Sequence, residues 1–85
     1  STKEKKVKLS ESFDYDKELF EALRAKRSEL AQDMEVPAYI IFSDKTLKHL
    51  AHDKPHDKTS MLKVNGVGEK KFEHFGEDFL QIINP

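Results

Sequence analysis

Residues 64–79 read VNGVGEKKFEHFGEDF, a glycine-containing turn followed by an amphipathic stretch. The pair Asn65-Gly66 is a turn signal that tolerates a positive φ, and Gly68 directly precedes the stretch. Within the stretch, apolar side chains recur at intervals of three, four and three residues, at Phe72, Phe75, Phe79 and Ile82. This spacing predicts a helix with one apolar face. The segment is therefore interpreted as a turn that joins two helices.

Gly76 interrupts this apolar face. Glycine inside a helix costs about 1 kcal/mol relative to alanine. A close crossing by another helix would explain its presence, so we expect a tight helix–helix contact there.

A long amphipathic helix is predicted over residues 14–34, well before the turn. Its apolar side chains fall within one arc at about 100° per residue, and they are Leu19, Phe20, Leu23, Leu30 and Met34. Asp14 or Asp16 can cap the start of this helix, and Pro37 biases Val36 away from helical geometry and so ends it.

Three shorter helices complete the expected fold. The composition of AYIIF (38–42) favours a strand, but the chain offers it no partner strand, so we expect a short helix. Ser43 caps a helix over 44–53, and Asp57 caps one over 58–64. The predicted fold is all-α, a compact bundle of about five helices, of which the second and fourth are short.

Arg27 is the one charged residue within the apolar arc of the first helix. Its stem can lie along the core with the guanidinium group in water. It can also form an ion pair with an acidic residue of another helix, or bind a phosphate.

Composition excludes several classes of protein. The chain has 85 residues, enough for one small domain, and no cysteine for a disulfide or thiolate metal site. Its longest apolar run is five residues, whereas a membrane helix needs about 20. The chain starts at Ser1 without a methionine, which predicts a piece of a longer protein. Residues 1–12 are expected to be a flexible basic arm or linker, and residues 13–85 the folded domain.

The net charge of −1 is uneven along the chain. The first eight residues carry +3, and the remaining 77 residues sum to −4. A domain that binds nucleic acid by charge alone is usually strongly basic. Any nucleic-acid binding here is therefore expected to be weak and to come from a local patch.

The glycine turn has two interpretations. Its backbone leaves room for a phosphate, the N–H groups at the start of the next helix favour an anion, and Lys70 and Lys71 add positive charge. Against this, Glu69 partly cancels those lysines, and glycine is common simply because it ends a helix.

The chain resembles the helicase-and-RNase-D C-terminal (HRDC) domain over residues 15–83, most closely the version found in bacterial RecQ-type helicases. The most specific segments are VPAYIIFSDKTL (36–47) and VNGVGEKKFEHFGEDF (64–79). The family fold is a bundle of about five helices with a helix-hairpin-helix-like glycine turn. This agrees with the fold predicted from periodicity.

The resemblance implies an accessory module of a 3′-to-5′ DNA helicase, which helps to choose DNA structures in repair and recombination. No catalytic residue is expected in the fragment, and it has no GxxxxGK[ST] phosphate loop. ATP and Mg²⁺ are implied for the parent motor and no cofactor for this domain. The implied partners are single-stranded or junction DNA, bound weakly, and the parent helicase core. A monomeric, cytoplasmic, nucleoid-associated domain that does not bind membranes is expected.

The resemblance also implies a DNA-binding patch, in which Tyr39 matches the aromatic residue of the VPxY segment. A tyrosine there can stack on a base of any identity. The full candidate set is Arg24, Tyr39, Lys45, Lys48, Asn65, Gly66, Gly68, Lys70 and Lys71. For Tyr39 the alternative is an ordinary aromatic at the edge of the core. For the basic residues it is a solvated surface.

The sequence also bears on four other functional classes. His49, His52 and His56 give an HxxHDxxH pattern, but Pro55 breaks the helix before His56, so no metal site is expected. Nothing resembles a hydrolase site. A protein-interaction or docking module remains open, as does the equivalent RNA-binding domain of an RNase D-like exonuclease.

Overall fold

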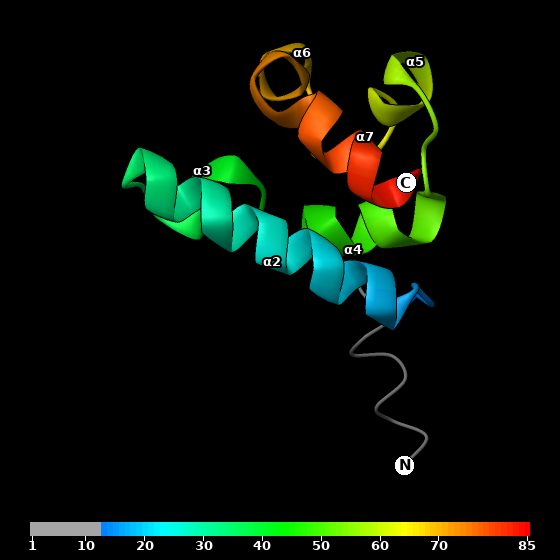
Figure 1. The fold of residues 1–85 in the computed structure, drawn as a ribbon. Helices are drawn as coiled ribbons and strands as arrows, with labels where there is room; N and C mark the ends of the chain where they lie inside the picture. Colours follow the sequence, from blue (N-terminus) through cyan, green and yellow to red (C-terminus); the bar gives the residue numbers. More distant parts are fainter. Residues whose placement is uncertain (1–12) are drawn as a thin grey trace, which may run out of the picture.

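A computed structural model describes residues 13–85, and the predicted basic arm at residues 1–12 lies outside the described part (Figure 1). The last three of its helical segments follow one another without a break, so the described chain forms five helices, as predicted. The segments are α2 (Lys17–Met34), α3 (Ala38–Ile41), α4 (Asp44–Asp53), α5 (Lys58–Met61), α6 (Glu69–Lys71), the π-helical turn η1 (Phe72–Gly76) and α7 (Glu77–Ile83).

Helix α2 begins at a side-chain cap, because the Asp16 carboxylate accepts a hydrogen bond from the Leu19 N–H at 3.0 Å. It ends at Glu35, which takes a left-handed conformation with φ 56° although it is not a glycine. One expectation for α2 is wrong: Met34 is 48% exposed. Figure 1 shows the last turn of α2 extending past α4 and α7 to lie beside α3, so the core does not cover it.

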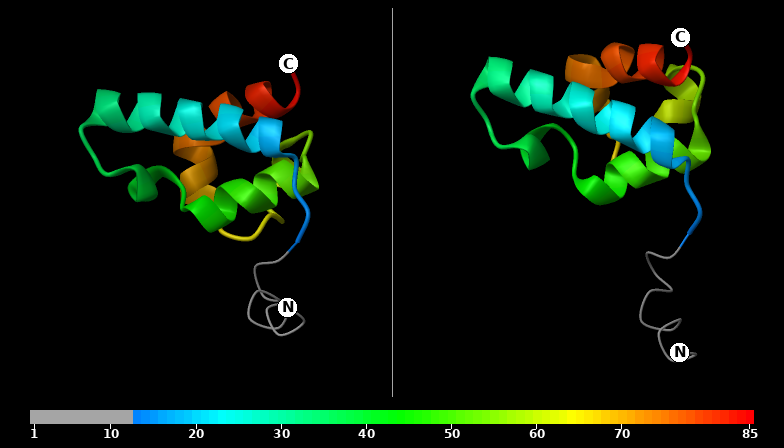
Figure 2. Two further views of the ribbon diagram at one scale, coloured as in Figure 1. Left: turned by 90° about the horizontal axis from the view of Figure 1, so that it is seen from below. Right: turned by 60° about the horizontal axis from the view of Figure 1, so that its bottom comes forward.

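Helices α2 and α4 lie side by side in both views of Figure 2, and α7 also packs against α2. The side chains between them form one core, whose largest fully buried members are Leu23, Ile41, Phe42, Leu47, Leu50, Met61 and Phe79. The Phe42 ring meets the Phe79 ring edge-on, with centroids 5.1 Å apart. Within residues 13–85, no helix combines the length and apolarity needed to cross a membrane.

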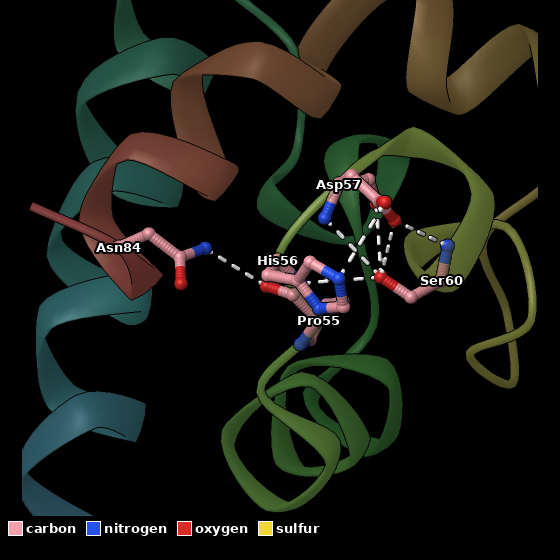
Figure 3. A network of polar contacts seen from close by, with 5 residues as sticks. All are labelled: Pro55, His56, Asp57, Ser60 and Asn84. Atoms are coloured by element: carbon pink, nitrogen blue, oxygen red, sulfur yellow. Dashed lines mark hydrogen bonds and ion pairs between the residues drawn. The ribbon is translucent and has the colours of Figure 1, made fainter.

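Helix α5 is a single turn that depends on its cap. The Asp57 carboxylate accepts the Ser60 N–H at 2.9 Å, and the Ser60 hydroxyl accepts the Asp57 N–H at 3.2 Å, which is a reciprocal capping box. Figure 3 shows these contacts beside a tie to the last helix, in which the Asn84 amide donates to the Pro55 carbonyl at 2.9 Å. The helix predicted over 58–64 is therefore shorter, and turns follow it.

The final helix contains a feature that periodicity did not predict, the π-helical turn η1. The expected explanation for Gly76 is also wrong. A Cβ atom at Gly76 would lie 2.2 Å from the Phe72 ring, which belongs to the same helix. The close approach therefore arises inside the π turn and not from a crossing helix. The predicted apolar face itself is confirmed, because Phe72, Phe75 and Phe79 are buried.

Two carboxylates that cap helices make the stability of the domain depend on pH. A backbone hydrogen bond from Leu19 and the Lys54 ammonium group lower the pKa of Asp16, and hydrogen bonds from Ser60 lower the pKa of Asp57. In each case the pKa in the folded state is below the value in the unfolded chain, which is near 3.8. Each carboxylate therefore stabilises the fold fully at pH values above 3.8. This stabilisation is lost as the pH falls through the folded-state pKa.

We expect the thermal midpoint to fall as pH decreases from about 5 to about 2.5. Asp16→Asn should make this fall smaller, because asparagine still caps a helix but does not titrate. The exposed Asp33 makes no cap hydrogen bond, so Asp33→Asn is the control. Thermal unfolding followed by circular dichroism measures all three proteins. Equal pH dependence in the Asp16→Asn variant and the wild type would contradict the expectation.

Candidate nucleic-acid interface

Helix α3 presents two apolar side chains to solvent. Its first and last residues, Ala38 and Ile41, are separated by three positions and face the interior together. The two residues between them must then point outward: Tyr39 is 69% exposed and Ile40 is 42% exposed. Tyr39 is therefore not a core-edge aromatic, and its ring is available for stacking.

Helix α6 is held against α3 by a lysine. The Lys71 ammonium group donates a hydrogen bond to the Ile40 carbonyl, a backbone acceptor of the short helix. Lys70 beside it is exposed. Between the two helices lies a groove of about 250 Å³. Its lining combines apolar and basic groups, from Met34, Ile40, Lys70, Lys71, His74 and Phe75.

The glycine turn packs against the start of α4. Gly66 has φ +96°, and a Cβ atom there would lie 2.0 Å from the Thr46 hydroxyl oxygen. Glycine is therefore required at position 66 by the backbone conformation and by packing, which agrees with the interpretation of the turn as a structural connection between helices. Gly68 differs, because a Cβ atom there would meet nothing within 4 Å. No side chain caps the helix that begins after Gly68, so its first N–H groups lack an intrahelical partner and a side-chain partner.

Arg27 forms an ion pair with another helix, the second of its three predicted roles. The side chain is buried, its Nη2 lies 2.8 Å from the Asp44 carboxylate, and its Nη1 donates to the Phe42 carbonyl at 2.9 Å. The guanidinium group is thus not in water and not free for phosphate. The ion pair with Arg27 also holds the carboxylate of Asp44, which is the residue next to Lys45.

A second acidic group near the candidate residues is also paired. The Glu69 carboxylate lies 3.9 Å from the Lys58 ammonium group. This exposed pair is weak, but it places a positive charge beside the acid that would otherwise cancel Lys70 and Lys71. The local balance is therefore more positive than the sequence order suggests.

A protein-family model described as the HRDC domain matches residues 16–83. The chain belongs to the HRDC family. This match covers the five helices and almost all of the described residues.

Comparison with individual proteins agrees with this family. This chain is 49% identical over 69 residues to a protein named ATP-dependent DNA helicase RecQ from Pasteurella multocida. The aligned residues cover 81% of this chain and 11% of that protein. The protein of the same name from Haemophilus influenzae is 43% identical over 70 residues, 82% of this chain and 11% of that protein. The chain therefore spans about a tenth of the length of these curated relatives.

The fold matches a solved structure described as D. radiodurans RecQ HRDC domain 3. The TM-score is 0.75 at 39% sequence identity, and the match covers 78% of this chain and 87% of that one. An HRDC domain of a RecQ protein is thus similar to this chain in both sequence and fold.

The predicted site residues of the HRDC domain fall into three groups. Lys70 and Lys71 of α6 line the groove with Ile40 of α3, and the exposed Tyr39 is the neighbour of Ile40 in the chain. The turn residues Asn65, Gly66 and Gly68 are exposed, and Gly66 packs against Thr46 at the start of α4, where Lys45 is also exposed. Lys48 and Arg24 lie elsewhere. The Lys48 ammonium group is 5.8 Å from the Tyr15 ring centroid, and Arg24 is exposed on α2, 3.4 Å from Glu21.

Sequence reasoning missed the apolar part of this surface. Met34 falls within the apolar arc of α2, and Ile40 lies in a run that reads as buried. Both are exposed, and both line the groove beside α6. Periodicity could not identify them, because it gives the face of a helix and not the extent of the elements that cover it.

Proposed function

We propose that this HRDC domain is an accessory nucleic-acid-binding module of a RecQ-type 3′-to-5′ DNA helicase, and that it tunes substrate choice in DNA repair and recombination. It binds single-stranded or structured DNA weakly through Tyr39, Lys45, Lys70, Lys71 and the open backbone at Gly68. The exposed Tyr39 ring, with lysines of α6 beside its helix, carries the proposal.

The chemistry of this surface suits a single strand. Base–aromatic stacking contributes about 1–3 kcal/mol per base and does not depend on base identity. Ammonium groups and unpaired N–H groups at the start of a helix attract phosphates. The nearby acids Asp44 and Glu69 are each held by a basic side chain, which lowers their repulsion of a polyanion.

Weak binding is compatible with such a role. Nonspecific dissociation constants for DNA are about 10⁻⁴–10⁻⁶ M. A module tethered to a motor already on DNA experiences an effective DNA concentration of order mM. Even a domain with a dissociation constant of about 100 μM would then be mostly bound.

Replacing Tyr39 by alanine is expected to weaken single-strand binding about fivefold or more, because one base loses its stacking partner. The loss should be the same for all sequences. Fluorescence anisotropy with labelled oligothymidine and oligoadenosine at low salt measures it. Tyr39→Phe is the matched control, since it keeps the ring, and should bind nearly as well as the wild type.

An affinity unchanged by Tyr39→Ala would rule out stacking on this ring. NMR titration of the labelled domain gives an independent test. Shifts at Tyr39, Lys45, Gly66 and Lys70 are expected when the strand is added. Absence of shifts at millimolar strand would instead favour docking of the domain on protein.

That second candidate function rests on the exposed apolar residues. Met34 and Ile40 line the groove, and Tyr39 is exposed next to Ile40 in the chain. Exposed apolar side chains that lie together are typical of interaction sites. The partner would be the parent helicase core. In the intact parent, Ile40→Ser should then loosen the domain from the core, whereas the DNA affinity of the isolated domain should change little.

The nature of the parent is part of the proposal. The two relatives named above are called ATP-dependent DNA helicases. A parent of this kind would use ATP and Mg²⁺ in its motor, with the present domain as a monomeric, cytoplasmic, nucleoid-associated module. An RNase D-like parent would direct the same surface to RNA. The residues that flank this chain decide between a motor and an acidic exonuclease core.

A further inference from the structure

The outward face of α4 carries a row of basic side chains. Lys45, Lys48, His49 and His52 are spaced i, i+3, i+4 and i+7, which places them on one face. The buried residues of α4 lie on the opposite face. The two acids of this helix are at its ends, where Asp44 pairs with Arg27 and Asp53 lies 2.7 Å from His52. Within α4, the only carboxylate that contacts the row is therefore that of Asp53, at its last member His52.

Aromatic side chains from the segment before α2 lie against this row. The Phe13 ring stacks on the His49 ring, with centroids 4.6 Å apart and an interplanar angle of 23°, and it meets His52 edge-on at 5.5 Å. The Tyr15 ring has the ammonium groups of Lys17 and Lys48 at 5.2 Å and 5.8 Å from its centroid. Aromatic and basic groups therefore gather at this end of α4. The carboxylates of Asp14 and Asp16 lie at its edge beside Tyr15, and that of Asp16 is 3.2 Å from the Lys54 ammonium group.

The ammonium groups there are available to a ligand. Among residues 13–85, neither Lys17 nor Lys48 has a carboxylate within ion-pair distance. The contact with Tyr15 leaves them cationic, because a ring face attracts a cation without neutralising it.

We propose that the outward face of α4, together with Tyr15 and Lys17, is a second binding surface for the phosphate backbone of a single strand. A strand whose base stacks on Tyr39 continues from Lys45 along α4 toward Phe13. Helix α4 has ten residues and is about 15 Å long, so the strand crosses it within a few nucleotides. The inference depends on the proposed function for the identity of the polyanion and extends the contact beyond the patch at α3.

The test uses the whole chain with both lysines replaced, Lys17→Gln and Lys48→Gln together. The charge-matched control is Lys26→Gln with Lys63→Gln, two lysines that belong to neither proposed surface: Lys26 pairs with Glu29, and Lys63 is exposed after α5. Anisotropy titrations use labelled dT5 and dT15 over a salt series. Thermal midpoints within a few degrees of the wild type establish that each variant is folded.

We expect the α4 variant to lose roughly fivefold or more in affinity for dT15, with the slope of log K against log salt smaller by about 1.4, since each phosphate contact contributes about 0.7. Its affinity for dT5 should fall less. The control variant should lose little for either strand. A dT15 affinity and salt slope equal to those of the control would overturn the inference.

Failure of the proposed function is distinguishable from failure of this inference. If Tyr39→Ala weakens binding and the α4 variant matches its control, the patch at α3 stands and the α4 surface does not. If the α4 variant loses affinity and Tyr39→Ala does not, the α4 surface stands without the stacking site.

Discussion

Gly66→Ala is expected to destabilise the domain by about 3 kcal/mol. A non-glycine residue in the left-handed region costs about 1–2 kcal/mol, and Gly66 has φ +96°. The added methyl group would also overlap the Thr46 side chain, and overpacking costs about 1–3 kcal/mol. Chemical denaturation followed by circular dichroism measures the loss, which is a large fraction of the stability of a small domain.

Gly68→Ala is the matched control, two residues along the same turn. At Gly68 the backbone has φ −103° and a Cβ atom would have no neighbour within 4 Å. Its expected effect is within about 0.5 kcal/mol, because a weaker helix cap is offset by reduced freedom of the unfolded chain. Equal destabilisation by the two substitutions would show that the turn is not fixed by its contact with α4.

A double-mutant cycle separates the two parts of the Gly66 effect. In a Thr46→Ala background, the hydroxyl and methyl groups that the new Cβ would overlap are gone. Gly66→Ala should then cost only the backbone part, about 1–2 kcal/mol. An unchanged cost in that background would mean that packing against Thr46 contributes nothing.

The second large effect is expected at Arg27. Arg27→Met should cost about 2–3 kcal/mol, because hydrogen bonds to charged groups contribute about 1.5–3 kcal/mol and the buried Phe42 carbonyl would lose its donor. Methionine keeps most of the apolar stem. Breaking a fully buried ion pair costs more, but Asp44 is 68% exposed and water can replace the guanidinium group there.

Arg24→Met on the same helix is the control, since Arg24 is exposed and pairs only with Glu21. It should change the free energy of unfolding by less than about 0.5 kcal/mol. Asp44→Asn separates the two partners of Arg27. A small effect identifies the Phe42 carbonyl as the main partner, whereas a loss equal to that of Arg27→Met would assign the stability to the ion pair.

Much of the fold followed from local patterns. The helix boundaries set by Asp16, Ser43 and Asp57 were predictable because a side-chain cap acts within three residues of its own position. The apolar face of the last helix was predictable from its period. The π turn was not, because a one-residue insertion in the helical ladder leaves almost no trace in spacing.

The candidate site was predictable only as separate pieces. Tyr39, Lys45, Lys70 and the glycine turn could each be singled out as residue types suited to DNA. Their grouping depends on two contacts between distant segments, Lys71 with Ile40 and Gly66 with Thr46. Neither contact has a signature in the sequence, because each joins residues 20 or more positions apart.

By itself, the sequence determined the class of fold, the start of most helices and the family, since these depend on periodicity, caps and motif residues close together in the chain. Only the tertiary structure decided which side chains are exposed. Tyr39 and Met34 are both outside the core, and Arg27 is inside it with a partner on α4. Exposure depends on which distant element covers a residue, and no local pattern contains that information.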